Sequence, residues 1–249
     1  MRATAIGIDI GGTGIKGGLV DVLSGELVGE RVRVATPEGG EPEDIARVVR
    51  EVIEQLDAPA EVPVGICFPS SIRHGVTMLA ANISQRWIGF EAEKFFEKEL
   101  GRNIHFVNDA DAAGYAEVIY GAAKNQKGLV IMTTLGTGIG AAMIYDGVLI
   151  PNAELGHLEI DGFDAEKRAS GVVREREGLS YPEWAERLQR YYSHVEMLFS
   201  PELFIVGGGV SKSYDKFLPL LELRTPIVPA TLFNKAGIMG AARLAYDLS

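Results

Sequence analysis

Asparagine and aspartate side chains cluster at Asn108-Asp109-Ala110-Asp111, between an apolar run and a helical pattern. A carboxylate in such a place is often only a helix cap, and that reading suits Asp111 better than Asp109. Aspartate is ordinarily ionised at neutral pH. Asp109 could therefore accept the proton of an attacking alcohol late in a phosphoryl transfer, while Asn108 contacts a second hydroxyl.

Two glycine-rich turns, each between apolar stretches, predict binding of phosphate groups. Five glycines fall within residues 11–18, where an ordinary hairpin would need one or two. The spacing also satisfies the dinucleotide fingerprint, but a strand over residues 15–22 argues against that site, and no P-loop motif occurs. The predicted phosphate-binding residues of the two turns are Gly11, Gly12, Thr13, Gly14 and Lys16 in the first and Thr134, Gly136, Thr137 and Gly138 in the second.

Two further sets of side chains fit the same chemistry. Asp9, at the end of the first strand, could hold a hydrated Mg²⁺ against phosphates. Glu154 and His157 supply the mixed donors and acceptors that recognition of a polyol requires, although this spacing alone is unspecific. The zinc-protease motif HExxH is absent.

The apolar patterns predict an α/β chain. We expect strands at 4–10, 15–22, 26–34, 62–68, 103–107, 128–135, 140–145 and 203–206. Helical periodicity predicts helices at 41–56, 91–100, 109–120, 181–198 and 236–246. The motif of a strand, a Gly-Thr-Gly turn and a second strand occurs twice, which indicates two related lobes with a cleft between them.

The composition excludes several classes of protein. The 249 residues include 24 Lys plus Arg against 34 Asp plus Glu, a net charge of −10, and no basic stretch stands out. We therefore expect neither a nucleic-acid nor a membrane-surface partner. The single cysteine, Cys67, excludes a disulfide framework and a cluster of thiolate ligands. The first residues lack the apolar core of a signal peptide, so we expect a cytoplasmic protein.

Seven stretches resemble the ROK family of sugar kinases and repressors, within the actin-like ATPase superfamily. They are IGIDIGGTGIKGGLVD, AANISQRWIG, NDADAAGYAE, TTLGTGIGAA, NAELGHLE, IVGGGVS and NKAGIMGAA, and they span nearly the whole chain. The resemblance implies a two-lobed actin-like (ribonuclease H-like) fold with a central active-site cleft. Its lobes would be residues 1–108, joined by a C-terminal helix at about 237–249, and residues 109–236.

The resemblance also assigns roles to residues. It makes Asp109 the catalytic base and, at the same time, one of the residues that bind the sugar, together with Asn82, Asn108, Glu154, His157 and Glu166. The segment Gly207-Gly208-Gly209 matches the one that lies against adenosine in ATP-using members, so ATP remains a possible donor. The resemblance also implies that the protein is a homodimer and that it uses Mg²⁺ as cofactor.

Further stretches, among them LIPNAELGHLEIDGFDAEKRAS and LLELRTPIVPA, resemble those members of the family that use inorganic polyphosphate. The expected reaction is transfer of a phosphoryl group from polyphosphate to the 6-hydroxyl of glucose, with mannose as a possible second acceptor. LEIDGFDAE replaces the cysteines that hold structural zinc in other members, so no structural zinc is expected and other contacts must order this loop. Pro69-Ser70-Ser71 departs from the family's usual Pro-Gly and leaves the tolerance for mannose open.

A polyphosphate site needs basic side chains beyond the turns. The candidates are Lys16, Lys124, Lys127, Lys167, Arg168, Lys212 and Lys235, most of which would individually be ordinary surface residues. An ATP-dependent glucokinase or other hexokinase is the alternative. A non-catalytic sugar sensor is a weaker alternative. We do not expect a repressor of this family, because only eight residues precede Asp9, too few for a DNA-binding module.

Overall fold

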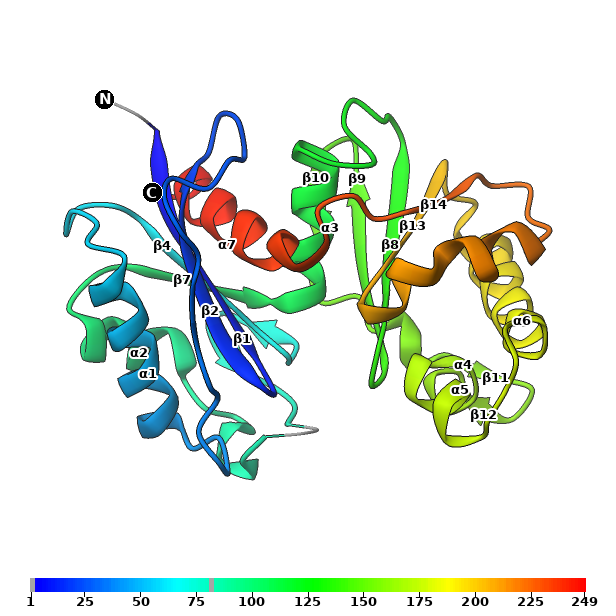
Figure 1. Ribbon diagram of the computed structural model, residues 1–249, viewed down its shortest axis with the longest axis horizontal. Helices are drawn as coiled ribbons and strands as arrows, with labels where there is room; N and C mark the ends of the chain where they lie inside the picture. The colour runs from blue at the N-terminus through cyan, green and yellow to red at the C-terminus, as the bar shows by residue number, and fades with distance from the viewer. Residues whose placement is uncertain (1–2, 81–82) are drawn as a thin grey trace. The chain divides into compact units, whose positions relative to one another are not determined.

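The computed structural model describes residues 3–80 and 83–249 and divides into two compact units (Figure 1). Unit 1 comprises Met1–Ala116 and Asn234–Ser249, and unit 2 comprises Glu117–Phe233. The division therefore falls inside one helix, α3 (Asp109–Ile119). Each unit contains one five-stranded sheet with its own hydrophobic core.

The sheet of unit 1 has the strand order β3-β2-β1-β4-β7. Strands β1 (Thr4–Gly11) and β2 (Gly14–Asp21) form the antiparallel hairpin, whereas β4 (Val64–Phe68) and β7 (Ile104–Asn108) run parallel to β1. The third strand, β3 (Val32–Val34), is much shorter than the expected 26–34. Gly29 has a φ of +88°, which interrupts the strand, and Leu27 forms only an isolated bridge to Val20.

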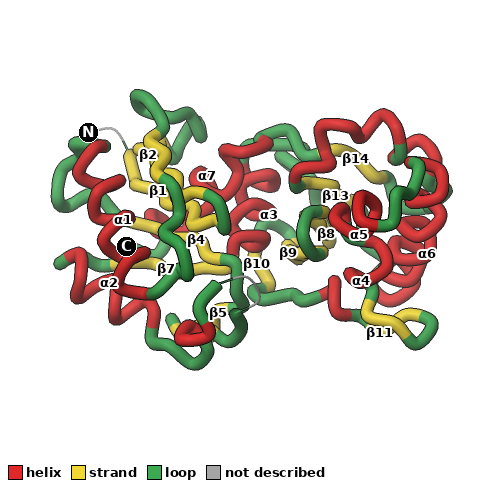
Figure 2. Tube along the Cα trace, turned by 60° about the horizontal axis from the view of Figure 1, so that its bottom comes forward, coloured by secondary structure: helices red, strands yellow, loops and turns green. Residues whose placement is uncertain are grey.

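Helices cover both faces of this sheet, α1 (Pro42–Gln55) and α2 (Ala92–Leu100) on one and α7 (Ala236–Asp247) on the other (Figures 1 and 2). Two adjacent glycines of β2 show this division, since neighbouring residues of a strand point to opposite faces. A Cβ on Gly17 would meet Val52 of α1, and one on Gly18 would come within 3.5 Å of Ile238 of α7. The sheet is thus a central layer with a core on each side.

Helix α7 lies unusually close to the sheet because two glycines face it. Gly7 and Gly65 are paired in register on β1 and β4. A Cβ on either glycine would lie 1.9 Å from a backbone oxygen of α7, that of Ile238 or Ala241. Any side chain at these two positions would therefore push the helix off the sheet.

Unit 2 contains a sheet of order β10-β9-β8-β13-β14. Its strands are β8 (Leu129–Leu135), β9 (Ile139–Tyr145), β10 (Val148–Ile150), β13 (Leu203–Gly207) and β14 (Ile227–Pro229). The long helix α6 (Tyr181–Phe199) contributes Trp184, Leu188 and Tyr192 to the core of this unit. It begins at a capping box, in which the Ser180 hydroxyl and the Glu183 carboxylate each accept the other residue's backbone N–H.

Short elements, which the sequence patterns did not predict, surround the two sheets. Unit 1 has the hairpin β5 (Ile72–Arg73) and β6 (Val76–Thr77), and unit 2 has the hairpin β11 (Glu159–Ile160) and β12 (Phe163–Asp164). The small helices α4 (Glu166–Ala169) and α5 (Gly171–Arg176) follow in unit 2. Single 3₁₀ turns occupy Gln85–Trp87, Leu155–His157, Leu218–Leu220 and Phe233–Lys235, and a longer 3₁₀ segment, Gly209–Lys216, is kinked at Ser213. Among the described residues, no helix combines the length and apolar character needed to cross a membrane.

Candidate active site

In unit 1 the parallel strands bring the predicted acidic residues to one edge of the sheet. Asp9 of β1 is paired in register with Cys67 of β4, and Phe68 of β4 is paired with Asn108 of β7. The carboxyl ends of these three strands therefore lie side by side, which is where α/β sheets usually bind their ligands. Asp9, Asn108 and Asp109 are thus near neighbours although they are far apart in the sequence.

Asn108 holds the start of α3 in place. Its side-chain Oδ1 accepts the backbone N–H of Asp111 at 3.0 Å, and its Nδ2 donates to the backbone oxygen of Ser70 at 3.0 Å. Asn108, rather than Asp111, therefore caps this helix, and Asp111 is completely buried. One Nδ2 hydrogen of Asn108 is engaged with Ser70, so only the other is available for the sugar contact that the sequence predicts.

Asp109 is the first residue of α3 and is half-buried. Its Oδ1 accepts the backbone N–H of Ala110 at 2.8 Å. Ser70, which follows the neighbouring strand β4, accepts the Asn108 amide with its backbone oxygen. Its hydroxyl in turn accepts the backbone N–H of Leu79 at 3.0 Å, which holds Ser70 in place. The carboxylate expected to act as base is thus held by a rigid junction of strand and helix.

Asp9 forms an ion pair with Lys16, whose Nζ lies 2.9 Å from Asp9 Oδ2. The other oxygen, Oδ1, has the Cys67 thiol at 3.8 Å. Burial, followed by the nearby Asp9 and Asp109 carboxylates, raises the pKa of Cys67 well above its usual value, so this cysteine stays a thiol. A largely hydrated Mg²⁺ is bound through one or two carboxylates, and Asp9, whose side chain is partly exposed at the strand end, offers one.

Arg33 was not predicted from the sequence as a site residue, yet it contacts the first glycine turn. Its Nη2 donates to the backbone oxygen of Thr13 at 3.1 Å, and its guanidinium lies over the Cα of Gly14. The register places Arg33 of β3 opposite Lys16 of β2, which is in turn opposite Asp9 of β1. These three side chains share one face of the sheet, so Arg33 extends the cationic side of the turn.

In unit 2 the second glycine turn lies beside the third glycine segment. Gly207 at the end of β13 is paired in register with Thr134 of β8, and a Cβ on Gly208 would lie 2.4 Å from the backbone oxygen of Leu135. Thr133, next to Thr134, is completely buried and shares a hydrogen bond with the Tyr192 hydroxyl at 2.5 Å. The predicted residues 134–138 and 207–209 are thus neighbours, whereas Thr133 belongs to the core.

Two of the three predicted sugar ligands of unit 2, His157 and Glu166, are connected by a further residue, Asp164. His157 Nδ1 lies 3.1 Å from Asp164 Oδ2 and 4.0 Å from Glu166 Oε1. The backbone N–H of Glu166 donates to Asp164 Oδ1 at 3.2 Å, and Glu166 Oε2 accepts the backbone N–H of Ile139 at 3.2 Å. Glu166 therefore also lies against the second glycine turn, where a Cβ on Gly138 would meet its carboxylate.

The surroundings of this cluster shift the pKa of two of its groups. The hydrogen bond to Asp164 raises the pKa of His157, and the nearby Glu166 carboxylate raises it further. Burial raises the pKa of the Glu154 carboxyl. The ligand atoms of His157, Asp164 and Glu166 lie within 4.8 Å of one another, but the hydrogen bonds among these residues account for that closeness without an ion.

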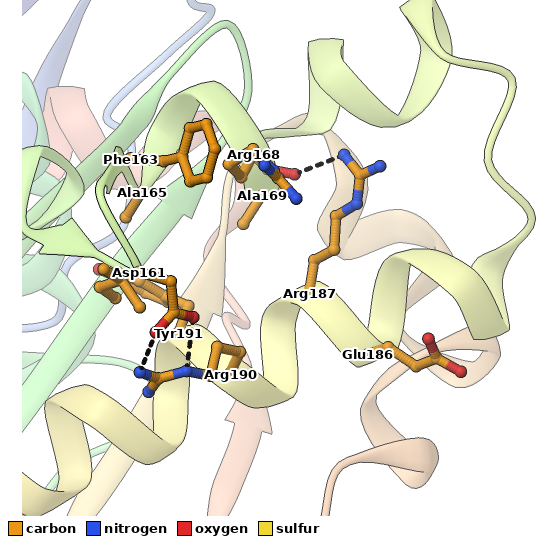
Figure 3. A pocket seen from close by; sticks show the side chains of 10 residues that line it. Asp161, Phe163, Ala165, Arg168, Ala169, Glu186, Arg187, Arg190 and Tyr191 are labelled. Carbon is orange, nitrogen blue, oxygen red and sulfur yellow. Dashed lines mark hydrogen bonds and ion pairs between the residues drawn. The ribbon is translucent and has the colours of Figure 1, made fainter.

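The hairpin β11–β12 occupies the place where other family members were expected to hold zinc. Its strands pair Glu159 with Asp164 and Ile160 with Phe163. Asp161, in its turn, accepts two hydrogen bonds from Arg190 of α6 at 2.9 and 2.7 Å, as Figure 3 shows beside a cavity of about 230 Å³. Trp184 of α6 donates to the backbone oxygen of Ala169 in α4 at 3.0 Å. Side-chain contacts with α6 thus order this loop.

Asn82, the remaining predicted sugar ligand, lies outside the described residues. The other predicted residues fall into two groups. Unit 1 holds Asp9, the turn 11–14, Lys16, Asn108 and Asp109, and unit 2 holds Glu154, His157, Glu166 and the two glycine segments.

The hairpin turn, the strand-end aspartates and the two α/β units together define a sugar kinase of the actin-like fold. The chain belongs to the ROK family, whose model matches residues 5–175. It is 48% identical to the polyphosphate glucokinase of Mycobacterium tuberculosis over 237 residues, which cover 95% of this chain and 89% of that protein. It is 46% identical to the polyphosphate glucokinase of Mycobacterium leprae over 97% of this chain and 74% of that protein.

Solved structures agree with this assignment. The inorganic polyphosphate/ATP-glucomannokinase from Arthrobacter sp. strain KM is 57% identical, with a TM-score of 0.91 and 98% of both chains covered. A ROK family glucokinase from Streptomyces griseus, in complex with glucose and AMPPNP, is 26% identical, with a TM-score of 0.84 over 98% of this chain and 99% of that one. The expected family and its two-lobed fold are therefore confirmed.

Proposed function

We propose that this protein transfers a phosphoryl group from inorganic polyphosphate to the 6-hydroxyl of glucose, with Asp109 as the base. The relatives named for this reaction match almost the entire chain at 46–57% identity. The observation that carries the assignment of the base is the junction of β7 and α3, where Asn108 and Ser70 fix the helix that begins at Asp109.

The chemistry follows from what a phosphoryl transfer demands. The transition state is loose, so the protein mainly has to position the alcohol and stabilise charge on the transferred group. Asp109 orients the 6-hydroxyl and accepts its proton as the bond to phosphorus forms. Asn108, Glu154, His157 and Glu166, together with Asn82, bind the other hydroxyls of the sugar.

The donor is bound by the glycine turns. Backbone N–H groups of Gly11, Gly12, Thr13 and Gly14 approach the phosphate oxygens, and Lys16 and Arg33 neutralise their charge. Residues 134–138 and 207–209 contribute the corresponding groups of unit 2. Asp9 would hold Mg²⁺, which supplies charge neutralisation to the phosphates when it is bound.

ATP is the second donor to consider, because the 57%-identical relative is named for both polyphosphate and ATP. The segment 207–209 lies beside Thr134, and a Cβ on Gly209 would meet no other described residue within 4 Å, so a nucleoside could lie against this glycine. Use of mannose, a homodimeric state and a cytoplasmic location are further parts of the proposal, which rest on the resemblance to the family.

Initial rates with four substrate pairs test the proposal: glucose or mannose, each with polyphosphate or ATP, at equal concentrations of phosphate. We expect glucose 6-phosphate to form fastest with polyphosphate. Saturable turnover with ATP alone would overturn the assignment of the donor, and the absence of turnover with glucose would overturn that of the acceptor.

A further inference from the structure

We infer that Asp164 is a positioning residue that fixes the orientation and protonation of His157 and the position of Glu166, and so sets the affinity for glucose. This inference rests on the proposed function, because it takes His157 and Glu166 as ligands of the sugar. Asp164 itself was not among the residues predicted from the sequence.

The two oxygens of Asp164 have separate partners. Oδ2 faces His157 Nδ1 at 3.1 Å, and Oδ1 accepts the backbone N–H of Glu166 at 3.2 Å. A carboxylate accepts hydrogen bonds but donates none when ionised, so the facing nitrogen of His157 must carry the hydrogen. His157 therefore keeps Nε2 for another partner, and one side chain aligns two proposed sugar ligands.

The position of Asp164 is itself well determined. It is the last residue of β12, paired in register with Glu159 of β11, and the next residue, Ala165, donates its backbone N–H to Leu158 at 2.9 Å. The turn of this hairpin has left-handed φ values at Asp161 and Gly162, 56° and 78°. The two hydrogen bonds between Asp161 and Arg190 then tie the turn to α6. The carboxylate thus has a rigid support, as a positioning group requires.

A simpler role for Asp164 would be to cap α4 through the contact with Glu166. That role needs only Oδ1, and it leaves the contact of Oδ2 with His157 unexplained. The charged groups around the imidazole are Asp164, Glu166 and Glu154, and Lys167 Nζ lies 4.0 Å from Asp164 Oδ2. Because the Lys167 side chain is 75% exposed, it competes only weakly for this carboxylate.

The test compares Asp164→Ala and Asp164→Asn with the wild-type enzyme and with Glu175→Gln. The last variant changes an exposed acidic residue of α5 that has no part in the support of Asp164. Glucose binding is measured by calorimetry without donor, and KM and kcat are measured for glucose and polyphosphate. ¹⁵N NMR of the four histidines reports the protonated nitrogen of His157, with His157→Gln to assign its signal.

We expect Asp164→Ala to weaken glucose binding and raise KM for glucose about tenfold or more, the size seen when the orienting partner of a ligand is removed. KM for polyphosphate should change less than twofold. In NMR, the Nδ1–H form of His157 should lose its predominance. Asp164→Asn should fall between Asp164→Ala and wild type, because its amide oxygen can accept one of the two hydrogen bonds, and Glu175→Gln should match wild type.

The inference would be overturned by a His157 signal that is unchanged in Asp164→Ala, or by a KM for glucose within twofold of wild type in that variant. Equal rises in KM for both substrates with a lowered melting temperature would also overturn it, because they would indicate a purely structural role. Failure of the proposed function looks different. In that case the wild-type enzyme does not phosphorylate glucose, while the NMR measurement still decides whether Asp164 controls His157.

Discussion

At the scale of single residues, the geometry of the site depends on side chains whose hydrogen bonds fix the position of neighbouring functional residues. Asn108 has its amide engaged by Ser70 and by the start of α3, and its neighbour Asp109 is thereby presented by a rigid junction. Placing a carboxylate in this way is most of what an enzyme must do in a loose phosphoryl transfer. We therefore expect that the proton-accepting role proposed for Asp109 can be removed without loss of glucose binding.

Asp109→Asn tests this expectation. The amide keeps the size and polarity of the side chain but cannot accept the proton, so we expect kcat to fall about 10²- to 10⁴-fold. Glucose affinity, measured by calorimetry, should stay within about threefold of wild type. Asp44→Asn, on α1, serves as the control, because the Asp44 side chain is about half exposed. Near-normal turnover in Asp109→Asn would remove this residue from the role of base.

At the scale of elements, strand register creates features that the linear sequence hides. Asp9, Lys16 and Arg33 are aligned across β1, β2 and β3, so two cations and a carboxylate share one face beside the first glycine turn. The protein as a whole carries a charge of −10, so a polyanionic donor depends on such a local concentration of positive charge.

Arg33→Ala should therefore weaken the use of polyphosphate. We expect KM for long polyphosphate to rise about tenfold, the loss of one charge-assisted hydrogen bond, with KM for glucose unchanged. The slope of log KM against log salt should also fall by about one. Arg47→Ala is the matched control, since Arg47 lies on α1 and forms an exposed ion pair with Asp44. An unchanged salt slope would exclude a contact between Arg33 and the donor.

A second consequence at this scale concerns the packing of α7. Gly65→Ala would place a methyl group 1.9 Å from the backbone oxygen of Ala241, so the helix must move. We expect the free energy of unfolding, from urea denaturation, to fall by about 1–3 kcal/mol. Gly12→Ala, which meets nothing within 4 Å, should change it by less than about 0.5 kcal/mol. Equal effects of the two substitutions would contradict this account of the packing.

At the scale of the whole molecule, the two units differ in how the chain builds them. Unit 2 is one continuous segment, Glu117–Phe233, with its own sheet and core. Unit 1 is completed only when the chain returns to it as α7, whose Ile238 and Ala242 join Ala5, Val20 and Val22 in a buried cluster. Folding of unit 1 therefore requires both ends of the chain, and folding of unit 2 requires neither.

We accordingly expect a fragment of residues 117–233 to fold by itself. It should show a cooperative thermal transition and the near-UV circular dichroism of packed Trp184, Tyr191 and Tyr192, all of which are buried in unit 2. A fragment of residues 1–116, which lacks α7, should not show a cooperative transition until a peptide of residues 234–249 is added. A non-cooperative fragment 117–233 would show that unit 2 depends on the rest of the chain.

Regular elements and the residues of local motifs could be predicted from the sequence because their signals are short in range. The two glycine turns, the strands that flank them and the helix that begins at Asp109 all follow from neighbouring residues. The strand 26–34 was predicted too long, because its apolar pattern continues across Gly29, where the backbone is left-handed. The hairpin β11–β12 escaped prediction because its two-residue strands carry no periodicity.

The sequence by itself determined the class of fold, the family and the residues whose chemistry suits phosphoryl transfer, because these depend on residue type and on spacing within short segments. Only the tertiary structure decided which side chains work together. Arg33 reaches the first turn through strand register, and Asp164 reaches His157 across a hairpin. Asn108 caps α3 in place of Asp111, since the backbone geometry at the end of β7 directs its oxygen to that N–H. Contacts of this kind depend on register and packing, which residue order alone does not specify.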